Sequence, residues 1–176
     1  MMIYMTKIKI MKTIVLYPGS FSPFHIGHLN IVEKAERIFG KGSVIIAMGI
    51  NPDKLKLGDD LDEHNEMMIL IKEEKEYEAS DLSKKIGRKV IVYSNFLHQL
   101  VEQYESLGYN VVVIRGLRNG TDLDYEVNQL RFVCDFKKDV NVVYITCDQK
   151  FEHISSSAIR KIGEFGGSDM VKNYLV

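Results

Sequence analysis

The chain has 176 residues, with 23 lysine or arginine side chains against 24 aspartate or glutamate side chains and a formal net charge of −1 at pH 7. This near-neutral balance argues against a nucleic-acid-binding protein, and no apolar run is long enough to cross a bilayer, so we expect neither nucleic acid nor membrane as a partner. The length fits a single domain with its own core, and two widely spaced cysteines, Cys134 and Cys147, fit the reducing cytoplasm.

The first part of the chain divides into an extension and the start of a folded domain. Residues 1–11 mix Met and Ile with lysines and show no secretory leader pattern, so we interpret them as an N-terminal extension of a domain that covers 12–176. The β-branched run from Thr13 to Tyr17 predicts a buried parallel strand. Apolar residues at helical spacing then predict an amphipathic helix from His28 to Phe39.

The loop between this strand and this helix has the sequence Y-P-G-S-F-S-P-F-H-I-G-H, from Tyr17 to His28. It ends in the specific pattern H-x-G-H and places His28 at a helix N-terminus, where free backbone amides and the helix dipole attract phosphate. Gly19 and Gly27 carry no Cβ, so a ligand can approach the backbone there. The loop therefore predicts a phosphate site.

Strands and helices alternate along the rest of the chain. The further strands are expected at 43–50, 90–93, 111–114 and 141–146, and the further helices within 56–85, over 96–107, after the expected N-cap Thr121, and from Ala158. Five strands separated by helices, with right-handed crossovers, predict an α/β fold. We expect a Rossmann-like, doubly wound, five-stranded parallel sheet in a single domain.

In such a sheet, ligands bind outside the carboxyl ends of the strands. Polar side chains follow four of the five expected strands at that edge. They are Ser20 and His28 after the first strand, Lys54 after the second, Arg115 and Arg118 after the fourth, and the serines 155–157 after the fifth. Histidine, several cations and two helix N-termini thus converge on one edge of a nearly neutral protein, which predicts a polyphosphate pocket.

Four motifs carry a resemblance to a known family. The loop Y-P-G-S-F-S-P-F-H-I-G-H, then N-P-D-K, R-G-L-R-N-G-T-D-L-D-Y-E and I-S-S-S-A-I-R resemble the successive motifs of bacterial-type phosphopantetheine adenylyltransferases, in the H-x-G-H nucleotidyltransferase superfamily. The resemblance implies adenylyl transfer from ATP to 4′-phosphopantetheine, giving dephospho-coenzyme A and pyrophosphate in coenzyme A biosynthesis. It also implies a cytoplasmic homo-hexamer, Mg²⁺ carried by the ATP phosphates rather than by protein ligands, and coenzyme A as a feedback ligand.

The same resemblance assigns roles to individual residues. Catalytic roles fall to His28, Lys54 and Arg115, and acceptor contacts fall to Ser20, Lys54, Leu97 and Arg115. The residues implied to contact ATP are Ser20, Phe21, His28, Gly116, Leu117, Arg118, Glu126, Phe151, Glu152, His153, Ile154, Ser155, Ser156 and Ser157. Because the acceptor phosphate is itself a nucleophile, catalysis reduces to in-line alignment and charge stabilisation without a covalent intermediate.

The chain departs from the family pattern at several positions. Ser22 stands where most relatives have Asp, His25 stands where they have Thr or an Asn-like residue, and the expected L-x-E-E-R signature is blurred within 61–66. His25 and the I-S-S-S-A-I-R motif also resemble nicotinate or nicotinamide mononucleotide adenylyltransferases, which is the alternative enzyme. A non-catalytic nucleotide sensor is an alternative of another class. His25 and His28 lack a third ligand at metal-site spacing, and no G-x-G-x-x-G follows the first strand, so a metalloenzyme and a Rossmann oxidoreductase are disfavoured.

Overall fold

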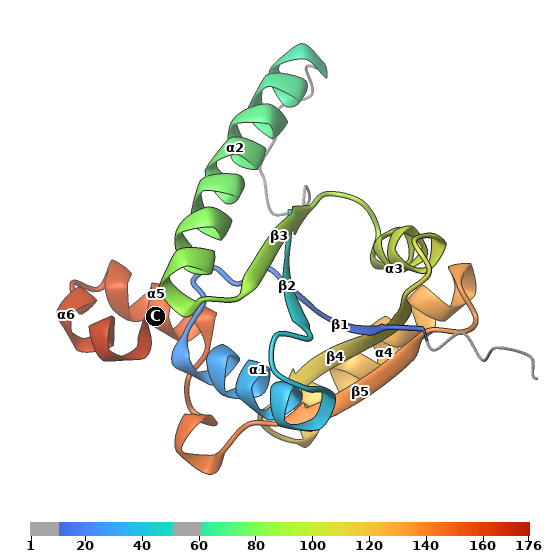
Figure 1. Ribbon diagram of the computed structural model, residues 1–176. Helices are drawn as coiled ribbons and strands as arrows, with labels where there is room; N and C mark the ends of the chain where they lie inside the picture. Colours follow the sequence, from blue (N-terminus) through green and yellow to red (C-terminus); the bar gives the residue numbers. More distant parts are fainter. Residues whose placement is uncertain (1–10, 51–60) are drawn as a thin grey trace, which may run out of the picture.

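The computed structural model describes residues 11–50 and 61–176 and contains one sheet of five parallel strands (Figure 1). The strands are β1 (Thr13–Gly19), β2 (Val44–Gly49), β3 (Lys89–Tyr93), β4 (Asn110–Leu117) and β5 (Asn141–Thr146). Their order across the sheet is β3-β2-β1-β4-β5, and Val15 of the central strand lies opposite Val44 on one side and Val112 on the other. The predicted parallel sheet is confirmed, and its topological switch point lies between β1 and β4.

Helices cover both faces of this sheet, as the doubly wound prediction requires. The helices are α1 (Ile26–Phe39), α2 (Leu61–Ile86), α3 (Leu97–Ser106), α4 (Gly120–Phe136), α5 (Ser156–Glu164) and α6 (Ser168–Val171), with 3₁₀ turns η2 (Gln149–Phe151) and η3 (Lys172–Tyr174). Helices α1 and α2 pack on the face that carries Val15, Tyr17 and Ile46, whereas α3 packs on the face that carries Leu16 and Val113. Each face is apolar because a parallel strand is buried on both sides.

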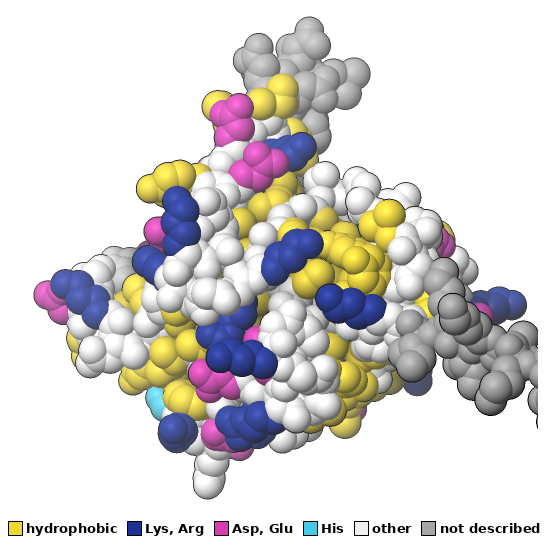
Figure 2. Space-filling view, viewed as in Figure 1, with side chains coloured by type: hydrophobic (Ala, Val, Ile, Leu, Met, Phe, Trp, Pro, Cys, Tyr) yellow, Lys and Arg dark blue, Asp and Glu magenta, His cyan; other side chains and the backbone are white. Residues whose placement is uncertain are grey.

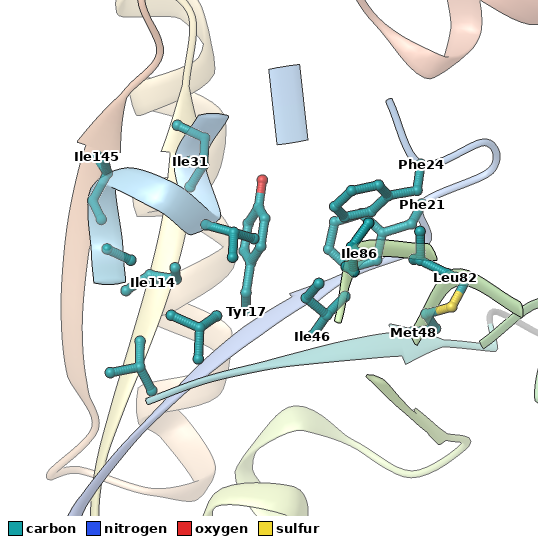
Figure 3. Packing of buried hydrophobic residues seen from close by; sticks show 14 of the residues in the cluster. Tyr17, Phe21, Phe24, Ile31, Ile46, Met48, Leu82, Ile86, Ile114 and Ile145 are labelled. Atoms are coloured by element: carbon teal, nitrogen blue, oxygen red, sulfur yellow. The ribbon is translucent and has the colours of Figure 1, made fainter. Parts of the chain in front are cut away.

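The loop after β1 is anchored in the hydrophobic core. Phe21 and Phe24 are buried in the same cluster as Leu82 and Ile86 of α2, and Figure 3 shows the two phenylalanines side by side next to these residues. Burying two aromatic side chains contributes several kcal/mol, on the order of 1.5–3 each. The backbone of a loop that the sequence predicts to bind phosphate is therefore held by the core.

Three helix starts differ by two residues from their sequence-based positions. Helix α1 begins at Ile26 rather than His28, because the His25 carbonyl already accepts the backbone N–H of Leu29 at 3.1 Å. The expected N-cap Thr121 is wrong, because Asn119 caps α4 by accepting the backbone N–H of Asp122 at 3.1 Å. Helix α5 begins at Ser156 rather than Ala158.

The charged segment before β3 forms one long helix in its described part. Figure 1 shows α2 extending from the sheet, with only its C-terminal part packed against the core. Residues 51–60 lie outside the described residues. Within 11–50 and 61–176, no helix is both long and apolar enough to cross a membrane.

Candidate functional site

The β1–α1 loop bends at Phe21, which has a left-handed backbone conformation with a φ of 44°. This bend turns the Phe21 ring into the core beneath Gly19, where an added Cβ would lie 2.8 Å from the ring. Gly19 is therefore required by close packing, and Ser20 is left exposed on the loop. The sequence predicted both Ser20 and Phe21 as phosphate contacts, and the structure places them at the carboxyl end of β1.

His28 lies within a cluster of aromatic rings. Its ring stacks on that of His25 with centroids 3.6 Å apart, and its centroid lies 4.9 Å from that of Phe21 and 5.3 Å from that of Phe24. The Nδ1 atom of His28 accepts the backbone N–H of His25 at 3.3 Å. A neutral imidazole has one acceptor and one donor nitrogen, so this bond assigns the His28 proton to Nε2.

The surroundings keep both histidines uncharged near neutral pH. Burial, followed by the charges of His25 and Arg118, holds the pKa of His28 well below its ordinary value of 6.5. Burial, followed by the Arg118 charge, lowers the pKa of His25 to about 4. The His25 side chain is 4% exposed, and its Nδ1 has no hydrogen-bond partner among the described residues. His28 can therefore act as a neutral Nε2–H donor rather than as a general acid of ordinary pKa.

Arg115 extends from the carboxyl end of β4 and bridges to β1. Its Nε donates to Glu126 Oε2 at 2.5 Å, and its Nη1 donates to the Pro18 carbonyl oxygen at 3.0 Å. The adjacent Gly116 packs directly on α1, because an added Cβ would lie 2.9 Å from Ile31 Cγ1 and 3.0 Å from the Tyr17 hydroxyl oxygen. These contacts fix the guanidinium at the switch point between β1 and β4.

Arg118, the first residue after β4, is held by an ion pair that uses two of its nitrogens. Its Nε and Nη2 each donate to an oxygen of Asp122 at 2.8 Å, and this guanidinium lowers the pKa of the Asp122 carboxyl. Arg118 lies close enough for its charge to depress the pKa of both His25 and His28. The structure thus brings the predicted residues of the β1 and β4 loops into one electrostatic site. The side chain of Leu117, another predicted ATP contact, is buried.

The serine segment after β5 docks on the β1–α1 loop. Ser155 caps α5 by accepting the backbone N–H of Ala158 at 3.1 Å, and Ser156 Oγ donates to the Pro23 carbonyl at 3.0 Å. The Arg160 guanidinium donates to the Ser22 carbonyl, which ties the first turn of α5 to the same loop. The N-terminus of α5 therefore lies beside the H-x-G-H loop.

The rest of this segment presents both buried and exposed side chains. Ile154 is buried, Phe151 is half-buried near Gly27, and Glu152, His153 and Ser157 are exposed. On the face that Figure 2 shows, Lys and Arg side chains lie across the middle of the surface among hydrophobic side chains. Lys54, the remaining predicted cation, lies outside the described residues.

A groove between the sheet and α4 continues the site away from the histidines. Arg115 and Glu126 line it together with the predicted Leu97, and the structure adds Gln129 and Tyr144, which the sequence-based analysis did not select. No sequence motif marks Tyr144, which shares one face of β5 with Val142 because side chains two residues apart in a strand point the same way. A larger hollow of about 320 Å³ beside edge strand β3 is lined by none of the predicted site residues.

The described part of the chain contains no group of three His, Cys, Asp or Glu side chains that could hold a metal ion.

The sequence is similar to that of a known protein family and to individual members of it. The model of the cytidylyltransferase-like family matches residues 16–162. A protein named phosphopantetheine adenylyltransferase from Clostridium botulinum is 30% identical over 168 residues, covering 94% of this chain and 92% of that protein. One of the same name from Leuconostoc mesenteroides is 31% identical over 160 residues, covering 91% and 88%.

A solved structure shares the fold at lower identity. It is a crystal structure from Vibrio parahaemolyticus whose protein was provisionally assigned as a nicotinate-nucleotide adenylyltransferase. The TM-score is 0.58 at 15% sequence identity, with 94% of this chain and 88% of that chain covered. At this identity the similarity concerns the fold alone.

Proposed function

Because the chain belongs to the cytidylyltransferase-like family and, within it, to the phosphopantetheine adenylyltransferases, we propose that it transfers the adenylyl group of ATP to 4′-phosphopantetheine. The products would be dephospho-coenzyme A and pyrophosphate. The observation that carries the proposal is the convergence of His28, Arg115 and the α5 N-terminus on the β1–α1 loop, in a member of a nucleotidyltransferase family.

The acceptor phosphate supplies the attacking oxygen, so the protein has to align two phosphates and stabilise charge. An acceptor oxygen would attack the α-phosphorus of ATP, and the bond from that phosphorus to the pyrophosphate oxygen would break in line. His28 Nε2–H would donate to an α-phosphate oxygen as its negative charge increases. The low pKa of His28 suits this role, because the neutral ring keeps the Nε2 proton that it shares with the phosphate.

Arg115 would clamp the acceptor phosphate together with Lys54. A guanidinium has five N–H donors in a planar fork, and Arg115 uses two of them on Glu126 and Pro18 within the described residues. The remaining donors suit a phosphate. The amides at the start of α5, with Ser155 to Ser157, would receive the β- and γ-phosphates.

Several features of the proposed enzyme extend beyond these contacts. When bound with ATP, Mg²⁺ would offset the charge of the phosphates. The enzyme would be located in the cytoplasm. Coenzyme A would bind it as a feedback ligand. A homo-hexamer would cover the aromatic surface of α4 and the residue before α3, where Phe96, Tyr125, Phe132 and Phe136 are exposed. Sedimentation velocity at micromolar concentration tests this assembly, and a monomer would contradict it.

Two alternatives remain for the acceptor and the activity. A nicotinate or nicotinamide mononucleotide acceptor is favoured by His25, which stands where most phosphopantetheine adenylyltransferases have Thr or an Asn-like residue. A non-catalytic sensor would bind ATP without turnover.

The deciding experiment incubates the purified protein with Mg-ATP and measures pyrophosphate release with each acceptor in turn. We expect release with 4′-phosphopantetheine. Release only with a mononucleotide would refute the proposed acceptor, and no release with any acceptor would favour the sensor.

A further inference from the structure

The groove between the sheet and α4 is charged at one end and apolar at the other. Arg115 and Glu126 form its charged end at the carboxyl edge of the sheet, and Val113, Val142 and Val133 form apolar walls beyond them. The open space in this groove is about 30 Å³, so beside a phosphate held at Arg115 it would take only the first groups of a ligand's arm.

One polar group in these walls has no partner. The Tyr144 hydroxyl is buried and forms no hydrogen bond with any described residue. A buried hydroxyl without a partner costs stability, so a side chain that keeps one beside a groove suggests a ligand or water that satisfies it. Burial raises the pKa of this phenol above its ordinary value of 10.0, so the hydroxyl remains protonated and can donate.

The register of the sheet places this hydroxyl beside the phosphate clamp. Tyr144 of β5 lies directly opposite Arg115 of β4, and both side chains line the same groove. Neighbouring strands are about 4.8 Å apart, so the tyrosine can reach the part of a ligand that immediately follows the phosphate. The charges of Arg115 and Glu126 both act on the Tyr144 phenol, which agrees with this placement.

We propose that the Tyr144 hydroxyl hydrogen-bonds the first polar group of the acceptor's arm beyond its phosphate, and so selects phosphate esters that carry a hydroxyl or amide there. The inference rests on the proposed function, because 4′-phosphopantetheine carries a hydroxyl and an amide at this position. Tyr144 is thus assigned as a specificity-determining residue. A site built to bond such a group discriminates against analogues that lack it.

The test compares Tyr144→Phe with the parent enzyme, because this change removes only the hydroxyl oxygen. Calorimetry measures the dissociation constant of 4′-phosphopantetheine, and inhibition assays measure that of neopentyl phosphate, which keeps the phosphate and branched carbon but has no hydroxyl or amide. We expect roughly five- to tenfold weaker binding of 4′-phosphopantetheine, as for one lost hydrogen bond, and unchanged binding of neopentyl phosphate and ATP. Tyr77→Phe, at an exposed tyrosine of α2, is the matched control.

Two outcomes would overturn the assignment. Equal binding of 4′-phosphopantetheine by Tyr144→Phe and the parent would show that the hydroxyl contacts no part of the acceptor. An equal loss for 4′-phosphopantetheine and neopentyl phosphate would show that the change acts through packing. The activity of the parent enzyme is measured separately. Failure to adenylylate 4′-phosphopantetheine would refute the proposed function together with the inference that rests on it.

Discussion

Acidification should destabilise the fold because the β1–α1 loop buries a stacked pair of histidines. His25 is almost fully buried, and its pKa is lowered to about 4 by burial and then by the Arg118 charge. The pKa of His28 is lowered in the same direction, chiefly by burial. In the unfolded chain both rings regain an ordinary pKa near 6.5.

Between about pH 6.5 and 4 the unfolded chain binds protons that the folded chain does not, so the free energy of unfolding decreases as the pH falls through this range. A pKa of about 4 for His25 corresponds to a loss of roughly 2 to 3 kcal/mol at pH 4.5 relative to pH 7.5. His28 adds to this loss. In a chain of this size the His25 contribution alone should lower Tm by roughly 5 to 10 °C.

Calorimetry of the parent and of His25→Asn at both pH values isolates this contribution. Asn is a favourable residue at the N-cap position of α1, and it carries no titrating ring. The pH-dependent loss of stability should be smaller in the variant by roughly 2 to 3 kcal/mol. Asp122, whose pKa Arg118 lowers, loses its stabilising charge only below this pH range and does so in both proteins. Identical pH dependence in both would show that His25 is not a buried neutral ring.

Three substitutions test the site itself. His28→Ala should keep the fold and lower turnover by on the order of 10²-fold, since its donor acts on developing charge; near-normal turnover would remove His28 from the mechanism. Arg115→Ala should raise the dissociation constant of the acceptor more than that of ATP, and equal losses in calorimetry would contradict the clamp assignment. Gly116→Ala should cost roughly 1 to 3 kcal/mol in denaturant unfolding, because a Cβ would meet Ile31 and Tyr17, whereas Gly120→Ala meets no atom within 4 Å and should be near neutral.

The strands and their order along the chain could be predicted because buried parallel strands are continuous apolar runs, and Asn141 to Thr146 of β5 is found as expected. Helix starts were less certain because several capping residues compete locally. Asn119 and Thr121 are two residues apart, and only the observed hydrogen bond to Asp122 decides between them.

The geometry of the site depended on tertiary contacts that no local pattern encodes. His28 stacks on His25 in a cluster that also contains Phe21 and Phe24, and Glu126 of α4 pairs with Arg115 of β4. The sequence predicted Glu126 as an ATP contact, and the structure shows it bound to Arg115. Tyr144 had no motif at all, and only the register opposite Arg115 reveals its position.

The ion pair of Arg115 with Glu126 is compatible with the clamp that we propose, because the two roles use different edges of the guanidinium. Glu126 receives the Nε–H, and the Pro18 carbonyl receives one N–H of Nη1. These two bonds hold the plane of the fork between β1 and β4 before any ligand arrives, so less side-chain entropy is lost on binding phosphate. A lysine at this position would carry the charge without the fork, and it could not satisfy Glu126, Pro18 and a phosphate in one fixed plane. In the proposed mechanism, the Glu126 carboxylate therefore positions the Arg115 clamp.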